Sequence, residues 1–268
     1  GLQTNGTLID DTWARFFKQR KFLIGLSLDG DFNNNSFRID EKGQNSFYKI
    51  INAANIFTKH GVDFNILTVL TGRCAENIDD ILRYFKKRGF RYLQFIPCLR
   101  PFGDTSESPL YMTVEQYKNF LIHGFNAYVK DYVRDEYTSI RYFDNLVHLY
   151  LGNPTEQCGM CGHCSHQFVA EGNGNIYPCD FYCTDEWLLG NINDENESFD
   201  TLTHSEKAIR FLKESIAVSD ECKRCKYFAL CRSGGCKRTR EDRNYCESYK
   251  AFFEACLPLF RAFIAEKK

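Results

Sequence analysis

The segment from Glu221 to Arg240 holds four cysteines among several lysines and arginines. Two of them, Cys222 and Cys225, are separated by two residues, a spacing at which both thiolates can bind one metal centre. The 268-residue chain has 13 cysteines, and most of them lie between Cys158 and Cys256. An odd number of cysteines without a secretion signal argues against a disulfide framework, because reducing compartments keep thiols free. Metal or iron–sulfur ligation is therefore favoured.

A second group of cysteines comes earlier in the chain, in the run CGMCGHCSHQFVAEGNGNIYPCD that begins at Cys158. Residues 167–177 alternate in polarity around Gly172-Asn173-Gly174, which predicts a β-hairpin. The hairpin has Cys164 on one side and Cys179 on the other, so both thiols can face one site. Eight thiolates would fill two four-cysteine sites. A redox iron–sulfur module and a structural zinc-binding or substrate-recognition module both remain open, and colour distinguishes them, because only iron–sulfur clusters are brown.

Composition narrows the class of protein. The formal net charge is -1 and 43% of residues are hydrophobic, which is enough for a substantial core. The near-neutral charge gives no support for a nucleic-acid or anionic-membrane partner. No apolar run is long enough to span a bilayer, and no signal peptide opens the chain. A cytoplasmic protein is expected.

The cysteine groups need a scaffold, and the first half of the chain alternates strand-like and helix-like segments. Short apolar segments at 22–28, 63–70 and 92–97 are typical of strands buried on both faces. Apolar residues recur at helical spacing over 47–57 and 78–85, followed by Gly61 and Gly89 at the expected helix ends. This order predicts an α/β fold with a parallel sheet.

The carboxyl ends of parallel strands are where such folds place their chemistry. The predicted strand ends are 27–30, 71–73 and 98–100. Two helices should follow, one from a capping box at Thr113 and Gln116 to about Arg134, and one over 140–151 that stops at Gly152. We predict a domain over 1–152 and a second, cysteine-rich domain over 153–268.

Several motifs resemble one family along essentially the whole chain. They read LQTNGTLID, GLSLDG, FNILTVLT, YLQFIPCL, SIRYFDNL and CGMCGHCSHQFVAEGNGNIYPCDFY, followed by the C-x2-C-x5-C spacing and a final Asn-Tyr-Cys. The chain resembles the anaerobic sulfatase-maturating enzymes, which are radical S-adenosylmethionine (SAM) proteins with a SPASM domain. The resemblance implies the C-terminal part of a partial (β/α)6 TIM-type barrel followed by a small cysteine-rich α+β SPASM domain. It also implies oxidation of a sulfatase cysteine or serine to formylglycine.

Two auxiliary [4Fe-4S] clusters follow from this resemblance. The first would be bound by Cys158, Cys164, Cys179 and Cys236, and the second by Cys222, Cys225, Cys231 and Cys246. In air-exposed material, empty or zinc-filled sites are expected instead.

The cysteine spacing departs from the family pattern in two ways. Four residues instead of three separate Cys231 from Cys236, which weakens the assignment of Cys236. Cys161 and Cys183 are additional thiols, and each could replace an assigned ligand or be a small buried side chain.

A larger departure is the absence of the family's catalytic C-x3-C-x2-C triplet and of its Gly-Gly-Glu-Pro motif. The triplet binds a third [4Fe-4S] cluster, whose open iron binds SAM. We therefore expect a fragment of a maturase that is inactive alone, with a naturally reduced relative as the alternative. An incomplete barrel would expose a sheet edge through which the chain could self-associate.

Matching positions suggest Asn5, Ser27 and Arg38 near the SAM site, although Asn5 could serve a turn and Arg38 could be a surface charge. Asp180 matches the family's base, which accepts the substrate's thiol or hydroxyl proton; its competing interpretation is a hairpin-end hydrogen-bond acceptor. The implied partners are an unfolded sulfatase polypeptide and an electron donor such as flavodoxin or ferredoxin. Another peptide-modifying SPASM maturase is the alternative enzyme.

Overall fold

The computed structural model describes residues 1–241 and 245–265. The chain divides into two compact units. The first is Gly1–Asp144 together with the C-terminal segment from Glu247, and the second is Asn145–Cys246. The predicted functional boundary after residue 152 stays a prediction.

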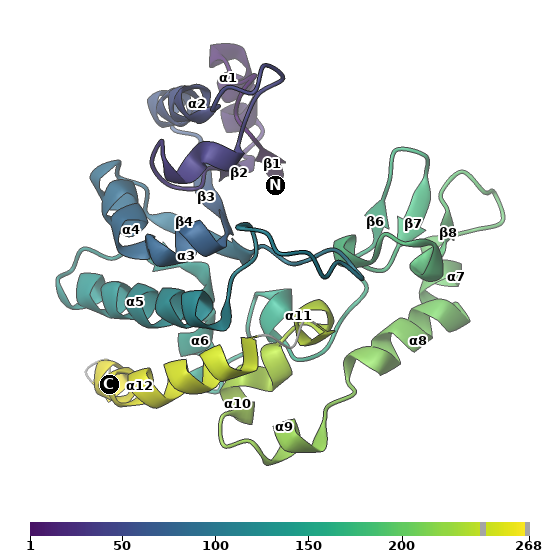
Figure 1. Cartoon of the computed structure of the whole chain (residues 1–268). Coiled ribbons are helices and arrows are strands. Elements are labelled where there is room, and N and C mark those ends of the chain that lie inside the picture. The colour runs from purple at the N-terminus through teal and green to yellow at the C-terminus, as the bar shows by residue number, and fades with distance from the viewer. Residues whose placement is uncertain (242–244, 266–268) are drawn as a thin grey trace. The chain divides into compact units, whose positions relative to one another are not determined.

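A five-stranded parallel sheet forms the centre of the first unit, with its strands in sequence order (Figure 1). The strands are β1 (Leu2–Thr4), β2 (Leu23–Ser27), β3 (Asp63–Leu70), β4 (Tyr92–Pro97) and β5 (Ser139–Ile140). The predicted parallel α/β fold is confirmed, and β3 and β4 have the predicted bounds. The apolar pattern did not indicate the two short outer strands, because two or three residues are too few to show a period.

Helices connect these strands, as parallel pairing requires. They are α1 (Asp11–Gln19), α2 (Phe47–His60), α3 (Gly72–Glu76), α4 (Ile78–Lys87) and α5 (Val114–Val133), and α6 (Arg141–Tyr150) follows β5. Gly61 ends α2 with a left-handed φ of 63°, and Thr113 and Gln116 form the predicted capping box of α5. The segment 71–73 follows the end of β3 as predicted, and α3 begins within it, because the Thr71 hydroxyl accepts the Cys74 N–H.

The C-terminal helix α12 (Cys246–Ala265) completes the core of the first unit by packing along α5 (Figure 1). The ring of Phe125 lies 5.7 Å from that of Phe252 and stacks on that of Phe260 at 5.1 Å. The Ser248 hydroxyl donates to the carbonyl of Val114 at 2.6 Å. The last helix of the chain is therefore part of the core formed by the first 144 residues.

The second unit is built around a small antiparallel sheet of β6 (Val169–Ala170), β7 (Asn175–Tyr177) and β8 (Gly190–Asn191). The predicted hairpin is confirmed as β6 and β7, and β8 was not predicted. The helices of this unit are α7 (Phe199–His204), α8 (Glu206–Ser215), α9 (Asp220–Arg224), α10 (Phe228–Cys231) and α11 (Lys237–Glu241). Its aromatic centre consists of Tyr182, Trp187 and Phe211, which are all buried.

Within the described parts of the chain, no helix combines the length and the apolar character needed to cross a membrane.

Candidate active site

Two predicted cofactor residues follow neighbouring strands at the carboxyl edge of the parallel sheet. Ser27 ends β2, and Asn5 follows β1, whose Thr4 pairs with Leu26. The Asn5 side-chain oxygen accepts from both the N–H and the hydroxyl of Thr7, at 3.1 Å and 2.9 Å. Asn5 therefore stabilises a turn here, and a role toward SAM stays a prediction for both residues.

Arg38 is held in an ion pair at the same edge. Its Nε and Nη2 lie 2.7 Å and 2.8 Å from the two carboxylate oxygens of Asp29, which is 5% exposed. Asp29 also accepts the N–H of Val69 at 2.9 Å, so the pair is anchored to β3. The ion pair and the hydrogen bond from Nη2 orient the guanidinium. Sequence reasoning missed Asp29 as a site residue, although its position directly after a buried strand was a usable signal.

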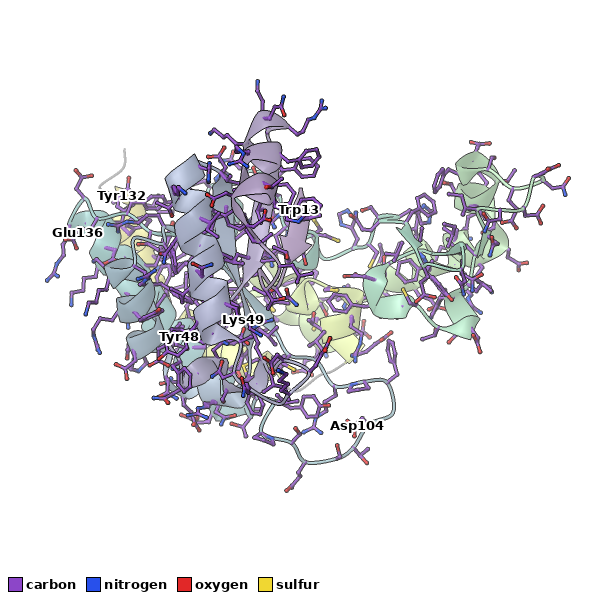
Figure 2. The ribbon with its side chains drawn as sticks, turned by 90° about the horizontal axis from the view of Figure 1, so that it is seen from above. Trp13, Tyr48, Lys49, Asp104, Tyr132 and Glu136 are labelled. Atoms are coloured by element: carbon purple, nitrogen blue, oxygen red, sulfur yellow. The ribbon has the colours of Figure 1, made fainter. Side chains whose placement is uncertain are left out.

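The loop after β4, at this edge, carries an arginine whose guanidinium stacks on a tyrosine ring. The Arg100 guanidinium lies 4.5 Å from the centre of the Tyr111 ring, and the Tyr111 hydroxyl donates to Asp104 at 3.1 Å. Asp104 lies on the long loop that leaves the body of the first unit in Figure 2. Burial, and then the charge of Asp29, raises the pKa of the Cys98 thiol at the start of this loop.

The second unit brings together the four cysteines predicted for the first cluster. Partial burial of the thiol, together with the neighbouring Cys236 and Cys164, raises the pKa of Cys158 to about 11. Burial also raises the pKa of Cys179, with additional contributions from Asp180 and Cys236. Cys164 and Cys179 both pack against the aromatic centre. We call these four residues, Cys158, Cys164, Cys179 and Cys236, the first cysteine group.

Asp180 lies beside this group and is exposed to solvent. Its Oδ1 accepts from the Cys179 thiol at 3.2 Å and from the Phe181 N–H at 3.1 Å. The carboxylate therefore lies next to a residue of the cysteine group, is held by the Phe181 N–H and remains reachable from solution. Hydrogen bonding at the hairpin end, the competing interpretation, is observed as well and does not block access.

The basic residues of the segment 221–240 divide into two classes. Lys223, Arg224 and Lys226 are exposed, as expected of a solvated face. Lys237, directly after Cys236, is only 8% exposed. Its Nζ lies 4.7 Å from the Tyr182 ring centre and 5.2 Å from that of Trp187, and it forms an ion pair with Glu241 at 2.7 Å. The Lys237 ammonium therefore lies over the same aromatic rings against which Cys164 and Cys179 pack.

The four cysteines predicted for the second cluster are also neighbours. Burial, together with the neighbouring Cys246, Cys222 and Cys225, raises the pKa of Cys231 to about 11. These four residues are the second cysteine group.

The additional thiols Cys161 and Cys183 donate to backbone carbonyls. Cys161 lies 3.7 Å from the Gln157 oxygen, and Cys183 lies 3.8 Å from the Cys179 oxygen. Cys161 also contributes to the raised pKa of Cys158. Whether either replaces an assigned ligand stays a prediction.

The chemistry of both groups fits iron–sulfur clusters. Neighbouring thiols resist ionisation, because thiolates that lie close together repel one another. A bound cationic metal centre stabilises the thiolates and so deprotonates the thiols. Among the residues that the structure describes, no three His, Cys, Asp or Glu side chains converge closely enough to hold one metal ion.

Comparisons with known proteins support the same assignment. The family model of the SPASM iron–sulfur cluster-binding domain matches residues 158–226. The chain is 44% identical to a cysteine-type anaerobic sulfatase-maturating enzyme of Clostridium perfringens, over 96% of this chain and 71% of that relative. It is 31% identical to a serine-type enzyme of Bacteroides thetaiotaomicron, over 96% of this chain and 67% of that relative.

A solved structure of native anSMEcpe with bound AdoMet and Cp18Cys peptide has the same fold. It superposes with a TM-score of 0.92 at 40% identity, covering 99% of this chain and 76% of that chain. Sequence and structure therefore agree over nearly the whole of the 268 residues, and the chain belongs to the anaerobic sulfatase-maturating enzymes.

Proposed function

We propose that the chain acts in the oxidation of a sulfatase cysteine to formylglycine, with Asp180 as the base. The observation that carries this proposal is the exposed Asp180 carboxylate next to a group of four cysteines. Oxidising a cysteine to a thioaldehyde removes one hydrogen atom, one proton and one electron. Water then replaces the sulfur, which leaves as hydrogen sulfide. An ionised carboxylate suits the proton-accepting step.

The two cysteine groups would each hold an auxiliary [4Fe-4S] cluster. Such clusters would supply acceptors for the electron left by the oxidation. The residues that would hold them are the first cysteine group and the second cysteine group as defined above. In both groups, neighbouring thiols raise the pKa of one another, which supports this assignment.

The carboxyl edge of the parallel sheet would hold SAM, which, when bound to its own cluster, supplies the hydrogen-abstracting 5'-deoxyadenosyl radical. Asn5, Ser27 and Arg38 are the proposed contacts. Arg38 is the best positioned of the three, because Asp29 holds its Nε and Nη2. Asp29 is thereby a positioning residue for this site.

Cysteine is the favoured substrate residue. The curated cysteine-type relatives are 42% and 44% identical to this chain, whereas the serine-type ones are 27% to 31% identical. The substrate is an unfolded sulfatase segment, because a cysteine must reach the base with its β-carbon exposed. A flavodoxin or ferredoxin supplies electrons. The cytoplasm suits these groups, since it keeps thiols reduced.

The 268 residues alone should not cleave SAM, because they contain no C-x3-C-x2-C triplet. The test measures 5'-deoxyadenosine and formylglycine with a cysteine-containing sulfatase peptide and a chemical reductant. We expect neither product from the reconstituted chain, and both from a fusion that places a family-type triplet segment before Gly1. SAM cleavage by the unfused chain would contradict this expectation. A fusion that cleaves SAM but leaves the sulfatase peptide unmodified would favour another peptide substrate.

The edge of the parallel sheet at β1 should support self-association with a second copy. Leu2 on β1 and Leu23 on the neighbouring β2 are exposed, and Trp13 on α1, labelled in Figure 2, adds an exposed ring. Unpaired backbone groups next to exposed apolar side chains favour strand pairing between copies. We expect a concentration-dependent dimer by sedimentation velocity that Leu2→Lys weakens. A monomer at all concentrations would rule the dimer out.

A further inference from the structure

The four residues between Cys231 and Cys236, one more than the family pattern has, form an unusual loop. Arg232, Ser233, Gly234 and Gly235 all have positive φ angles, of 48°, 60°, 79° and 77°. Glycine adopts this region without strain, but a side chain does not. Ser233 therefore adopts a strained conformation, and such strain persists only where the surrounding structure holds the residue in place.

Close packing explains why one of these positions must be glycine. A Cβ on Gly235 would lie 2.1 Å from the carbonyl oxygen of Gly159. The Gly235 carbonyl also accepts the N–H of Gly162 at 2.8 Å. The loop is therefore held against the segment that carries Cys158 and Cys161, and its conformation is fixed by that contact.

Two donors of this loop point at sulfurs of the second cysteine group. The Ser233 hydroxyl donates to Cys222 Sγ at 3.3 Å, and the Gly234 N–H donates to Cys231 Sγ at 3.4 Å. Ser233 is 9% exposed, so water competes little for its hydroxyl. A thiolate bound to iron has no proton to donate, so the hydroxyl must be the donor once a cluster is present.

Arg240 stabilises the same loop from outside. Its Nε donates to the Ser233 carbonyl at 3.3 Å, and its Nη2 donates to the Gly162 carbonyl at 3.1 Å. Its Nη1 binds the carbonyls of Ser215 and Ala217 at 2.8 Å and 2.7 Å. The backbone of Ser233 is thus fixed independently of its side chain, which lets a substitution remove the hydroxyl without releasing the loop.

We propose that Ser233 is a positioning residue that sets the reduction potential of the cluster held by the second cysteine group. This inference rests on the proposed function, because it needs a cluster at that group. A hydrogen bond to a ligand sulfur stabilises the added negative charge of the reduced cluster, and so raises its potential. The conformation of this four-residue loop would then make the second cluster easier to reduce.

The test compares Ser233→Ala and Ser233→Gly in the 268-residue chain, reconstituted anaerobically with ferrous iron and sulfide. Both variants should retain the second cluster, and its potential should fall by an amount equivalent to about a tenfold change in the oxidised-to-reduced ratio, about 59 mV for one electron. Ser233→Gly should unfold at a higher denaturant concentration than Ser233→Ala, because glycine suits the positive φ. The reduction potential of the second cluster and the denaturant concentration of unfolding should therefore change independently.

Ser219→Ala is the matched control. The Ser219 hydroxyl accepts the N–H of Cys222 at 3.3 Å and caps α9, but it does not donate to the sulfur. We expect lower stability and an unshifted potential. The potential of the second cluster is identified as the wave that is lost in Cys231→Ala.

Three results would overturn the inference. An unshifted potential in a fully loaded Ser233→Ala protein would remove the role of the hydroxyl while leaving the proposed cluster intact. A shift in Ser233→Ala that Ser233→Gly restores would assign the effect to backbone strain instead. Failure of the unaltered chain to load iron at the second group would overturn the proposed cluster itself, and this inference with it.

Discussion

Asp180→Asn is expected to lower formylglycine formation by about 10²- to 10⁴-fold in the triplet-bearing fusion, the range typical of losing a general base. Cleavage of SAM should continue at nearly the unaltered rate, because the asparagine removes a proton acceptor and leaves the SAM edge unchanged. The amide also preserves the shape of the side chain and can still accept the Phe181 N–H. The measurement is the ratio of formylglycine to 5'-deoxyadenosine in one reaction.

Asp185→Asn is the matched control, because Asp185 is another exposed aspartate at the start of a short helical turn of the same unit. We expect it to leave the product ratio unchanged. Equal loss of both products in Asp180→Asn would instead make Asp180 a structural residue of the hairpin end.

Iron content should separate the two cysteine groups. The unaltered chain should bind about eight irons after anaerobic reconstitution if each group holds a four-iron cluster. Cys179→Ala and Cys231→Ala should each retain about four, because each removes one ligand from a different group. Chemical iron analysis and the brown absorption of the sample provide the measurement.

Cys256→Ala is the control for losing a cysteine as such, since Cys256 is buried on α12 outside both groups. It should keep about eight irons. If Cys179→Ala also kept about eight, Cys161 or Cys183 would have replaced the missing ligand, and the assignment of the first group would change. About four irons in the unaltered chain would mean that one group does not form.

Local patterns predicted much of the scaffold. The bounds of β3 and β4 followed from short apolar segments buried on both faces, and Gly61 ends α2 as its position indicated. Thr113 and Gln116 form their capping box because that motif involves only residues three apart. Each of these features is decided by neighbours in the sequence.

Features that depend on distant contacts could not be predicted in this way. Lys237 reads as one more cation in a basic run, and only the fold places it over Tyr182 and Trp187. Asp29 reads as a loop residue until Arg38 and Val69 are found beside it. In the sequence, Ser233 is only one of the four residues between Cys231 and Cys236. Its hydrogen bond to Cys222 depends on a backbone conformation that serine does not favour.

The packing of α12 against α5 has a consequence for biosynthesis. Phe252 and Phe260 complete the core around Phe125, yet they are made only after the whole of the second unit. At typical ribosomal speeds, the interval between the emergence of α5 and that of α12 is on the order of ten seconds. During this time, the aromatic face of α5 lacks its cover. Because α12 begins with Cys246, the fourth thiol of the second cysteine group arrives with the same helix. The apolar core and the second cysteine group are therefore both completed only after α12 has been synthesised.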